Sequence, residues 1–289
     1  MENTNIESCK APFMVLLGSP VNLSKSPLMH NTAFEELGLD YRYYAVDATE
    51  ETLAEVVEKL KKQGAVGWNC TMPVKTKMYE LCDELSTSAK LMKAVNTVVY
   101  KDGKVIGHNT DGFGFVNAVA SVGFSVENKT LTILGTGGAA KAMITQSALD
   151  GAKEIFVFGR PGAGFNAMRE MLISVMEHTN CKITLLKYER NKLNECISKS
   201  DILANATKVG LNVPNVCVLS DFSALKRNML VFDAIYEPEM TLLLKQGHAA
   251  GSKTLNGTDM LFYQGAEAFK IWTGKEMPIH IKELVEEVQ

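Results

Sequence analysis

Residues 130–140 read T-L-T-I-L-G-T-G-G-A-A, an apolar run of strand length followed directly by a glycine cluster that opens an Ala-rich helix. The stretch Gly135-Thr136-Gly137-Gly138-Ala139-Ala140 fits the pattern G-x-G-x-x-G/A, which binds the pyrophosphate of a dinucleotide. In that pattern Gly135 makes the tight turn, Gly137 lets the pyrophosphate approach the backbone, and Ala140 allows close packing of helix on strand. Backbone N–H groups at the start of such a helix hold an anion. The strand-and-helix context therefore favours a dinucleotide-binding unit of the Rossmann type over a tight turn without a ligand.

Short apolar runs alternate with amphipathic segments on both sides of this stretch. After it, strands are expected at Glu154–Phe158, Lys182–Leu186, Asp201–Ala204 and Leu230–Ala234, with helices near 167–177 and 192–199. Before it, strands at Phe13–Leu17, Tyr41–Val46 and Gly64–Asn69 alternate with helices over 28–37, 53–63 and 76–85. This rhythm predicts the α/β class, with mostly parallel sheets covered by helices.

The two series predict two domains. Between them lies the Gly-rich, polar segment 106–114, where we expect the hinge. The last helical stretches, 260–273 and 279–288, follow the last strand expected in the second series, so we expect them to return to the first domain. The sequence thus predicts a discontinuous N-terminal α/β substrate domain, 1–112 plus 258–289, and a Rossmann-type domain, 113–257.

Composition excludes several classes of protein. The 289 residues are 46% apolar and 22% charged with a net charge of −3, and no run of five like charges suggests a nucleic-acid or membrane partner. The six cysteines are far apart and form no C-x-x-C pair, so no metal site is expected. The first ten residues carry two Glu and no basic cluster, and no apolar run approaches the roughly 18 residues of a membrane span. We expect a cytoplasmic protein.

The end of the second strand of the Rossmann series bears on the choice of cofactor. It reads Phe158-Gly159-Arg160-Pro161, with no Asp or Glu before Glu170. A carboxylate there would accept from the 2′-hydroxyl of NAD, whereas Arg160 can pair with the 2′-phosphate of NADP. The sequence predicts NADP, with NAD as a second cofactor; an exposed loop arginine is the alternative.

In the first series, polar residues follow an apolar strand in Asn69-Cys70-Thr71-Met72-Pro73-Val74-Lys75. They should lie at the carboxyl edge of the sheet, where α/β proteins bind ligands. There Lys75 can exchange a proton with a substrate hydroxyl. The alternative is a solvated surface lysine at a helix start.

Further polar clusters are Ala94-Val95-Asn96-Thr97 and Gly107-His108-Asn109-Thr110-Asp111-Gly112. Asp111 could share the proton of Lys75, and Asn96 could bind a substrate hydroxyl; a turn with a helix cap explains the second cluster equally well. Near the start, Ser24-Lys25-Ser26-Pro27 offers two hydroxyls, for which Ser26 as a helix N-cap is the alternative.

These clusters, in this order, resemble the shikimate/quinate dehydrogenase family from about Phe13 to Thr273. The resemblance implies that Ser24 and Ser26 bind the substrate carboxylate. It also implies that Thr71 and Asn96 bind substrate, and that Lys75 and Asp111 are catalytic. The stretches Asp233-Ala234-Ile235-Tyr236-Glu237-Pro238 and Tyr263-Gln264-Gly265-Ala266 are similar to family motifs that place Tyr236 and Gln264 near substrate. The cofactor-binding residues that it implies are Gly135, Gly137, Gly138, Ala139, Arg160, Asn205, Thr207 and Gly257.

Several residues depart from the family pattern. Leu23 stands where His is usual, and Lys93 where Gly is usual. Asn256-Gly257-Thr258-Asp259-Met260 replaces D-G-x-G-M, which puts Asp259 where a glycine backbone usually approaches the nicotinamide ring. In the ribose loop the usual Asn before Arg160 is Gly159, and the usual second basic residue is Gly164. The catalytic set is intact, while the preference for NADP is expected to be weaker.

The resemblance implies reversible, nicotinamide-dependent reduction of 3-dehydroshikimate to shikimate in aromatic amino-acid (chorismate) biosynthesis. Quinate as the main substrate is one alternative, since the serine pair leaves room for either ring. A non-catalytic module that senses shikimate or quinate is an alternative of another class. We expect a small-molecule substrate and a monomer or homodimer.

Overall fold

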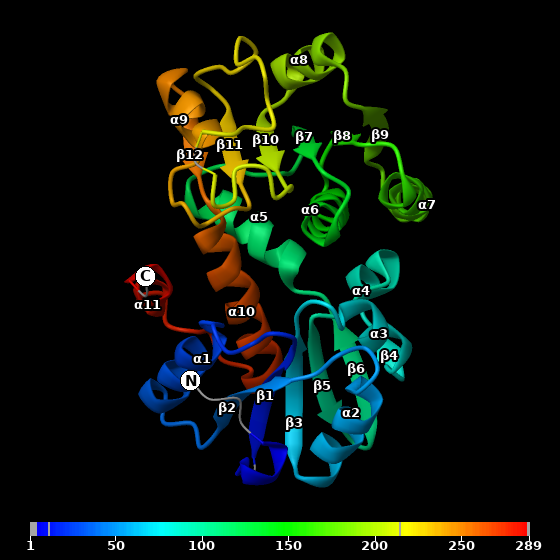
Figure 1. Ribbon diagram of the computed structural model, residues 1–289, viewed down its shortest axis with the longest axis vertical. Helices are drawn as coiled ribbons and strands as arrows, with labels where there is room; N and C mark the ends of the chain where they lie inside the picture. Colours follow the sequence, from blue (N-terminus) through cyan, green and yellow to red (C-terminus); the bar gives the residue numbers. More distant parts are fainter. Residues whose placement is uncertain (1–4, 11, 214, 288–289) are drawn as a thin grey trace. The chain divides into compact units, whose positions relative to one another are not determined.

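The structure is a computed structural model that describes residues 5–10, 12–213 and 215–287. The chain divides into two compact units, Met1–Thr110 with Gln264–Gln289, and Asp111–Tyr263. The domain boundaries expected from the sequence, after residues 112 and 257, stay a prediction. The α/β class is confirmed, since each unit holds one sheet flanked by helices (Figure 1).

The first unit contains a six-stranded sheet in the spatial order β2-β1-β3-β5-β6-β4. Its strands are β1 (Phe13–Gly18), β2 (Arg42–Asp47), β3 (Ala65–Cys70), β4 (Glu84–Leu85), β5 (Thr97–Lys101) and β6 (Lys104–His108). Strands β2, β1 and β3 are parallel, whereas β5 pairs antiparallel with both β3 and β6. The β5–β6 hairpin turns at Asp102 and Gly103, both with positive φ, as a two-residue turn requires. The segment expected to be a linker over 106–114 therefore begins with a strand.

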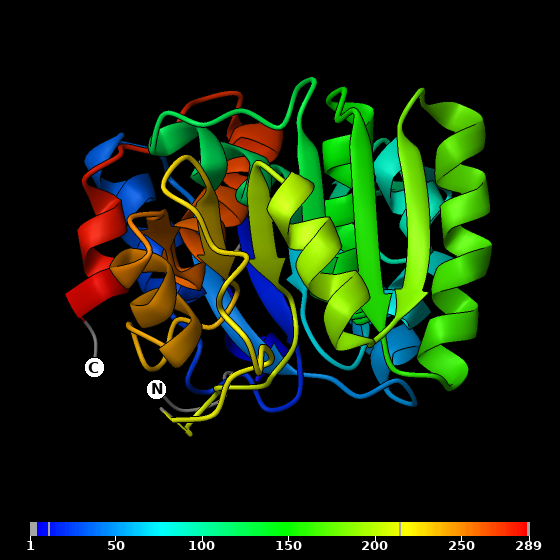
Figure 2. The ribbon, with the colours of Figure 1, turned by 90° about the horizontal axis from the view of Figure 1, so that it is seen from above.

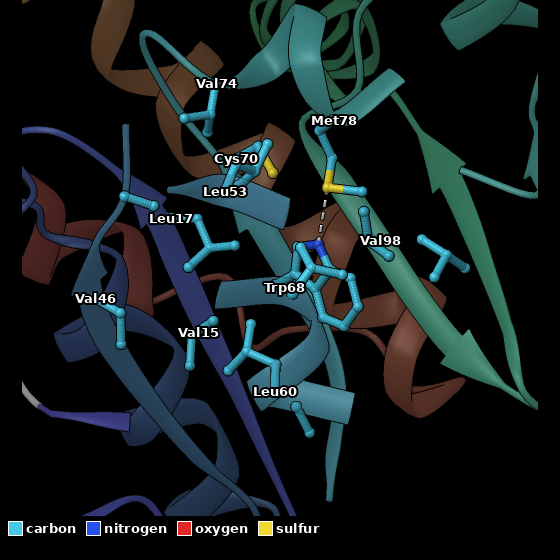
Figure 3. Close-up of a cluster of buried hydrophobic side chains, with 14 of the residues drawn as sticks. Val15, Leu17, Val46, Leu53, Leu60, Trp68, Cys70, Val74, Met78 and Val98 are labelled. Atoms are coloured by element: carbon cyan, nitrogen blue, oxygen red, sulfur yellow. Dashed lines mark hydrogen bonds between the residues drawn. The ribbon is translucent and has the colours of Figure 1, made fainter. Parts of the chain in front are cut away.

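Three helices cover one face of this sheet, namely α2 (Leu53–Lys62), α3 (Lys75–Glu80) and α4 (Thr87–Met92). The resulting core gathers apolar side chains from the strands and these helices around the fully buried Trp68 (Figure 3). The Trp68 indole N–H contacts the Met78 sulfur at 3.2 Å. The helix expected over 76–85 is wrong in its second half, because Asp83 bonds the backbone of Val105 through both its N–H and its carboxylate. That contact directs Glu84–Leu85 into the sheet as β4.

The other face is covered by α1 (Ser26–Glu36) and by the part of α10 (Gly257–Thr273) that follows Gln264. Aromatic rings fill this layer: Phe34 of α1 stacks on Phe269 of α10 with centroids 5.2 Å apart. The Trp272 indole donates to the carbonyl of Val98 at 2.9 Å, which fixes α10 on the sheet. The last helix, α11 (Ile281–Glu287), packs against α1.

The second unit contains six parallel strands in the order β12-β11-β10-β7-β8-β9. Its strands are β7 (Thr130–Leu134), β8 (Glu154–Gly159), β9 (Lys182–Lys187), β10 (Ile202–Asn205), β11 (Leu230–Asp233) and β12 (Lys253–Leu255); its helices include α5 (Asp111–Ser121), α6 (Gly138–Leu149), α7 (Ala163–His178), α8 (Arg190–Lys199) and α9 (Leu242–Ala249). Helix α6 packs against α5 and α7, while α8 and α9 contribute to the opposite apolar layer (Figure 2). Strand β12 was not expected from the sequence.

The strand order reverses direction between β7 and β10. Chain order runs outward from β7 through β8 to β9 on one side, and from β10 through β11 to β12 on the other. Ligands of open α/β sheets bind at the carboxyl ends of the strands that flank such a reversal. Among the helices that the structure describes, none has both the length and the apolar composition needed to cross a bilayer.

Candidate active site

The glycine loop between β7 and α6 has the geometry of an anion site. Gly135 has a φ of +120°, and a Cβ there would lie 3.0 Å from the carbonyl oxygen of Ala206, so only glycine fits without strain. Gly137 is the N-cap residue of α6, so no side chain of the cap residue occupies the N–H groups at the start of this helix. A Cβ at Gly137 or Gly138 would meet no heavy atom within 4 Å. The space beside both glycines is thus open, as binding of an anion by the N–H groups that begin α6 requires.

Packing after β8 explains two departures from the family pattern, Gly159 and Gly164. A Cβ at Gly159 would lie 2.5 Å from the Thr136 Cγ2, and one at Gly164 would lie 3.3 Å from the Thr136 hydroxyl oxygen. The Thr136 side chain therefore occupies the space beside both glycines, and an Asn at position 159 would collide with it. Arg160 is exposed directly after this point.

A second cation, Lys187, lies at the carboxyl end of the strand next to Arg160 and was not expected from the sequence. Lys187, the last residue of β9, is in register with Gly159, the last residue of β8. The charge of Arg160 also reaches the neighbouring Tyr188, whose pKa burial raises to about 12 against the opposing effect of that charge. The signal that could have revealed Lys187 is its place at the carboxyl end of the strand next to Arg160.

The carboxyl ends of β10 and β11 are joined through the buried Asp233. Its carboxylate accepts from the Asn205 side-chain amide at 2.9 Å, from the Ile235 N–H at 3.1 Å and from the Thr241 hydroxyl at 2.8 Å. The Asn205 oxygen in turn accepts from the N–H and the hydroxyl of Thr207. Burial raises the pKa of Asp233 to about 6, against these hydrogen bonds, which lower it. Asn205 is thus placed to hold Thr207 rather than to reach a ligand with its own amide.

Two further expected residues lie in the same unit. Tyr236 follows β11 and is 43% exposed; burial, with the nearby charge of Glu237, raises its pKa. Gly257 begins α10 where a Cβ would overlap the carbonyl of Ala234, so its lack of a side chain serves close backbone packing. Asp259, expected near the nicotinamide ring from the family pattern, is buried and accepts from the Ser121 hydroxyl at 3.1 Å. That bond joins the start of α10 to the end of α5.

In the first unit, the backbone brings Thr71 and Lys75 to the carboxyl edge of the sheet. The Thr71 N–H donates to the Leu17 carbonyl of β1 at 2.8 Å, and its methyl group lies beside Gly18. Lys75 is the first residue of α3 and is half-buried. Its carbonyl accepts from the Val95 N–H at 3.0 Å, which places it next to the Asn96 segment.

Asn96 is the hub of this edge and is almost fully buried. Its side-chain oxygen accepts from the Thr110 N–H at 2.8 Å, and its amide donates to the Thr110 hydroxyl at 3.0 Å and to the Gln264 oxygen at 3.4 Å. Asp111 follows Thr110 in the chain and is the half-buried first residue of α5. The amide therefore connects the end of β6, the start of β5 and α10.

The serine pair lies at the start of α1. The Ser24 hydroxyl donates to the Ser26 hydroxyl oxygen at 3.2 Å and accepts from the Ser26 N–H at the same distance. The N-cap interpretation of Ser26 is wrong: the cap position is Lys25, which makes no side-chain cap bond, and Ser26 is already helical. Both serines are half-buried.

The expected site residues divide between the two units. The first unit holds Ser24, Ser26, Thr71, Lys75, Asn96 and Gln264; the second holds Asp111, Tyr236, Gly135, Gly137, Gly138, Ala139, Arg160, Asn205, Thr207 and Gly257. Across residues 5–10, 12–213 and 215–287, no three His, Cys, Asp or Glu side chains gather to hold a metal ion.

Comparison with known proteins identifies the family. The family model of the shikimate dehydrogenase substrate binding domain matches residues 16–98, and that of the shikimate 5'-dehydrogenase C-terminal domain matches residues 257–281. A shikimate dehydrogenase (NADP(+)) of Alkaliphilus metalliredigens is 42% identical over 273 residues, which cover 93% of this chain and 94% of the relative.

Two solved structures are similar to this chain over nearly its whole length. Shikimate 5-dehydrogenase from Listeria monocytogenes, in complex with shikimate and NAD, has a TM-score of 0.91 and 39% identity and covers 96% of both chains. The ligand-free 5-ketofructose reductase of a Gluconobacter strain has a TM-score of 0.88 and 30% identity, over 97% of this chain and 99% of that one. With this identity over this length, the chain belongs to the shikimate dehydrogenase family.

Proposed function

We propose that this protein is an NADP-dependent shikimate dehydrogenase that reversibly reduces 3-dehydroshikimate to shikimate in aromatic amino-acid biosynthesis. The observation that supports it best is the set of polar side chains in the first unit: Ser24 is bonded to Ser26, the Asn96 amide is bonded to Gln264, and the Lys75 carbonyl is bonded to Val95, next to Asn96. A ring that carries one carboxylate and several hydroxyls matches this set of donors and acceptors. The curated relatives with about 42% identity carry the same activity in their names.

The substrate-binding roles follow from the chemistry of each group. Ser24 and Ser26 hold the carboxylate by donating hydrogen bonds from their hydroxyls. Each bond is strong because the acceptor is charged. Asn96, with Thr71 and Gln264, binds ring hydroxyls through amide and hydroxyl groups that can both donate and accept. These contacts fix the ring with its reacting carbonyl at Lys75.

The proton and the hydride have separate sources. NADPH, when bound, supplies the hydride to the carbonyl carbon. As negative charge develops on the carbonyl oxygen, the Lys75 ammonium stabilises it and gives it a proton, and Asp111 assists by sharing that proton. In the reverse direction Lys75 takes the proton from the hydroxyl.

The residues proposed to hold the cofactor fit a dinucleotide phosphate. Gly135, Gly137, Gly138 and Ala139 leave the N–H groups at the start of α6 accessible to the pyrophosphate. Arg160, with Lys187 on the adjoining strand, supplies positive charge for the 2′-phosphate, so NADP is the expected cofactor and NAD the second. Thr207, held by Asn205, and Gly257 complete the set.

Initial rates at the absorbance band of reduced nicotinamide test this proposal. Shikimate, quinate and 5-ketofructose (the last as the substrate named for the Gluconobacter relative) are each tested in the appropriate direction with NADP(H) and NAD(H). We expect kcat/KM to be highest for shikimate with NADP. A higher value for quinate would make quinate the main substrate, and shikimate binding without turnover would favour the sensing module. A cytoplasmic location and a monomer or homodimer are part of the same proposal.

A further inference from the structure

Tyr43 occupies an unusual place beside the proposed substrate site. It lies on β2, the edge strand of the first sheet, yet it is only 1% exposed. Its ring stacks on His30 with centroids 4.4 Å apart and planes 16° from parallel, and it also packs against Trp272 at 6.0 Å. Both neighbours come from the helices that cover this face. The ring is thereby fixed, and so is the direction of its hydroxyl.

The Tyr43 hydroxyl connects two parts of the proposed site. It donates to the Asn69 side-chain oxygen at 2.7 Å, on β3. Against the larger effect of burial, the neighbouring Ser26 hydroxyl, at the start of α1, lowers the pKa of the Tyr43 phenol. A residue on the edge strand thus reaches across β1 to the third strand, with the serine pair beside its hydroxyl.

From Asn69 the hydrogen bonds continue to the amide hub. The Asn69 amide donates to the Asn96 carbonyl and to the Thr97 hydroxyl, both at 3.0 Å. The Thr97 hydroxyl donates to the Asn96 side-chain oxygen at 2.9 Å. Tyr43 therefore begins a chain of hydrogen bonds that ends at the group proposed to hold a ring hydroxyl, and its own hydroxyl neighbours Ser26, proposed to hold the carboxylate.

This network is buried and its members have partners. Asn69 is 7% exposed, Asn96 2% and Thr97 none, and all three are hydrogen-bonded. In a medium of low dielectric such bonds are strong and an unpaired member is costly. Burial, with a smaller contribution from Cys70, raises the pKa of Tyr43 well above its usual value. The phenol therefore keeps its proton and remains a donor.

We infer that Tyr43 is a positioning residue that sets the spacing between the carboxylate site at Ser26 and the hydroxyl site at Asn96. The inference rests on the proposed function and deepens it. Without the phenol hydroxyl, Asn69 loses the donor that orients its amide, and the Ser26 hydroxyl loses a polar neighbour. The free site then has to be ordered when substrate binds, which weakens binding more than it slows the chemical step.

The test compares Tyr43→Phe with Tyr44→Phe. The control removes the same atom from the next residue of β2, where the half-buried Tyr44 hydroxyl accepts only a long bond of 3.4 Å from the Lys10 N–H. Loss of one net hydrogen bond predicts a rise in the shikimate KM of about 3- to 10-fold for Tyr43→Phe, with the NADP KM unchanged and kcat lowered less. The control should behave as the wild type.

A double-mutant cycle separates positioning from a general loss of structure. If Tyr43 acts through Ser26, the change Tyr43→Phe raises the shikimate KM by a smaller factor in the Ser26→Ala background than in the wild type. Equal factors in both backgrounds, or a rise in the NADP KM of the same size, would overturn the inference.

A measurement on the wild type does not depend on how the variants fold. With tyrosine labelled by ¹³C at the ring carbon that carries the hydroxyl, saturating shikimate should shift the Tyr43 resonance and leave that of Tyr44 in place. An unmoved Tyr43 resonance overturns the inference while the proposed function stands. If the wild type neither binds nor turns over shikimate, the proposed function fails and the inference fails with it.

Discussion

The change Gly137→Ala, which adds one methyl group, should weaken cofactor binding while leaving the stability of the fold almost unchanged. Gly137 has φ −84° and ψ −172°, extended values that alanine adopts without strain, and the added Cβ meets no heavy atom within 4 Å. A compatible Gly→Ala change stabilises by about 0.4–1 kcal/mol through the unfolded chain, while the loss of a glycine N-cap costs a similar amount. The free energy of unfolding of Gly137→Ala should therefore stay within about 1 kcal/mol of the wild type.

The same methyl group enters the space proposed for the pyrophosphate. Each lost hydrogen bond to a charged phosphate costs about 1.5–3 kcal/mol, so the KM for NADP should rise about ten- to hundredfold per bond. The KM for shikimate, whose proposed site is in the other unit, should stay unchanged. Steady-state kinetics with each substrate varied, together with thermal unfolding, checks both expectations.

Gly135→Ala is the matched contrast, one residue before Thr136. Its φ of +120° and the Ala206 carbonyl 3.0 Å from the added Cβ predict a loss of stability as well as weaker cofactor binding. An unchanged NADP KM in a stable Gly137→Ala protein would refute the assignment of this loop to the cofactor. A Gly135→Ala protein as stable as the wild type would refute the loop geometry.

The remaining predictions concern the proton, the 2′-phosphate and a buried carboxylate. Lys75→Ala and Asp111→Asn should each lower kcat at least about a hundredfold, with little change in the shikimate KM; near wild-type kcat in both would make Lys75 a surface lysine. Arg160→Ala should raise the NADP KM about tenfold or more and leave the NAD KM unchanged, and an unaltered ratio of the two would remove Arg160 from the phosphate site. Burial raises the pKa of Asp233 from 3.8 to about 6, so the protonated carboxyl favours the fold below pH 3.8 and this advantage is lost as the pH rises through 6. The wild type should lose about 3 kcal/mol of its free energy of unfolding in this way, whereas Asp233→Asn should not. Urea unfolding followed by far-UV circular dichroism should therefore show the free energy of unfolding of the variant rising relative to that of the wild type between pH 4 and 7. A difference that is flat over that range would contradict the burial of this charge.

Much of the fold could be predicted because its parallel strands are short apolar runs with helical segments between them. The strand expected over Thr130–Leu134 has the same bounds in β7. The hairpin of β5 and β6 is hard to predict because its strands are short and its turn rests on the single pair Asp102-Gly103. The three-residue strand β12 carries no periodicity that distinguishes it from a loop.

The candidate site could be predicted where a residue's role follows from its place at the end of a strand. Lys75 follows β3 in this way, whereas Asn96 precedes the antiparallel strand β5; the structure places their segments side by side. The contacts of Tyr43 could not be predicted, because an aromatic residue on an edge strand carries no sign of which side chains its hydroxyl will reach. The collision between Thr136 and a side chain at position 159 depends on the packing of two loops far apart in sequence.

Transfer of deuterium from NADPH tests the central claim most directly. The wild-type protein is incubated with 3-dehydroshikimate and with NADPH that carries deuterium at one or the other face of nicotinamide C4, in separate reactions, and the product is analysed by mass spectrometry. The account predicts shikimate that is one mass unit heavier with one of the two labelled cofactors and unlabelled with the other. No shikimate, or shikimate without deuterium from either cofactor, would contradict it.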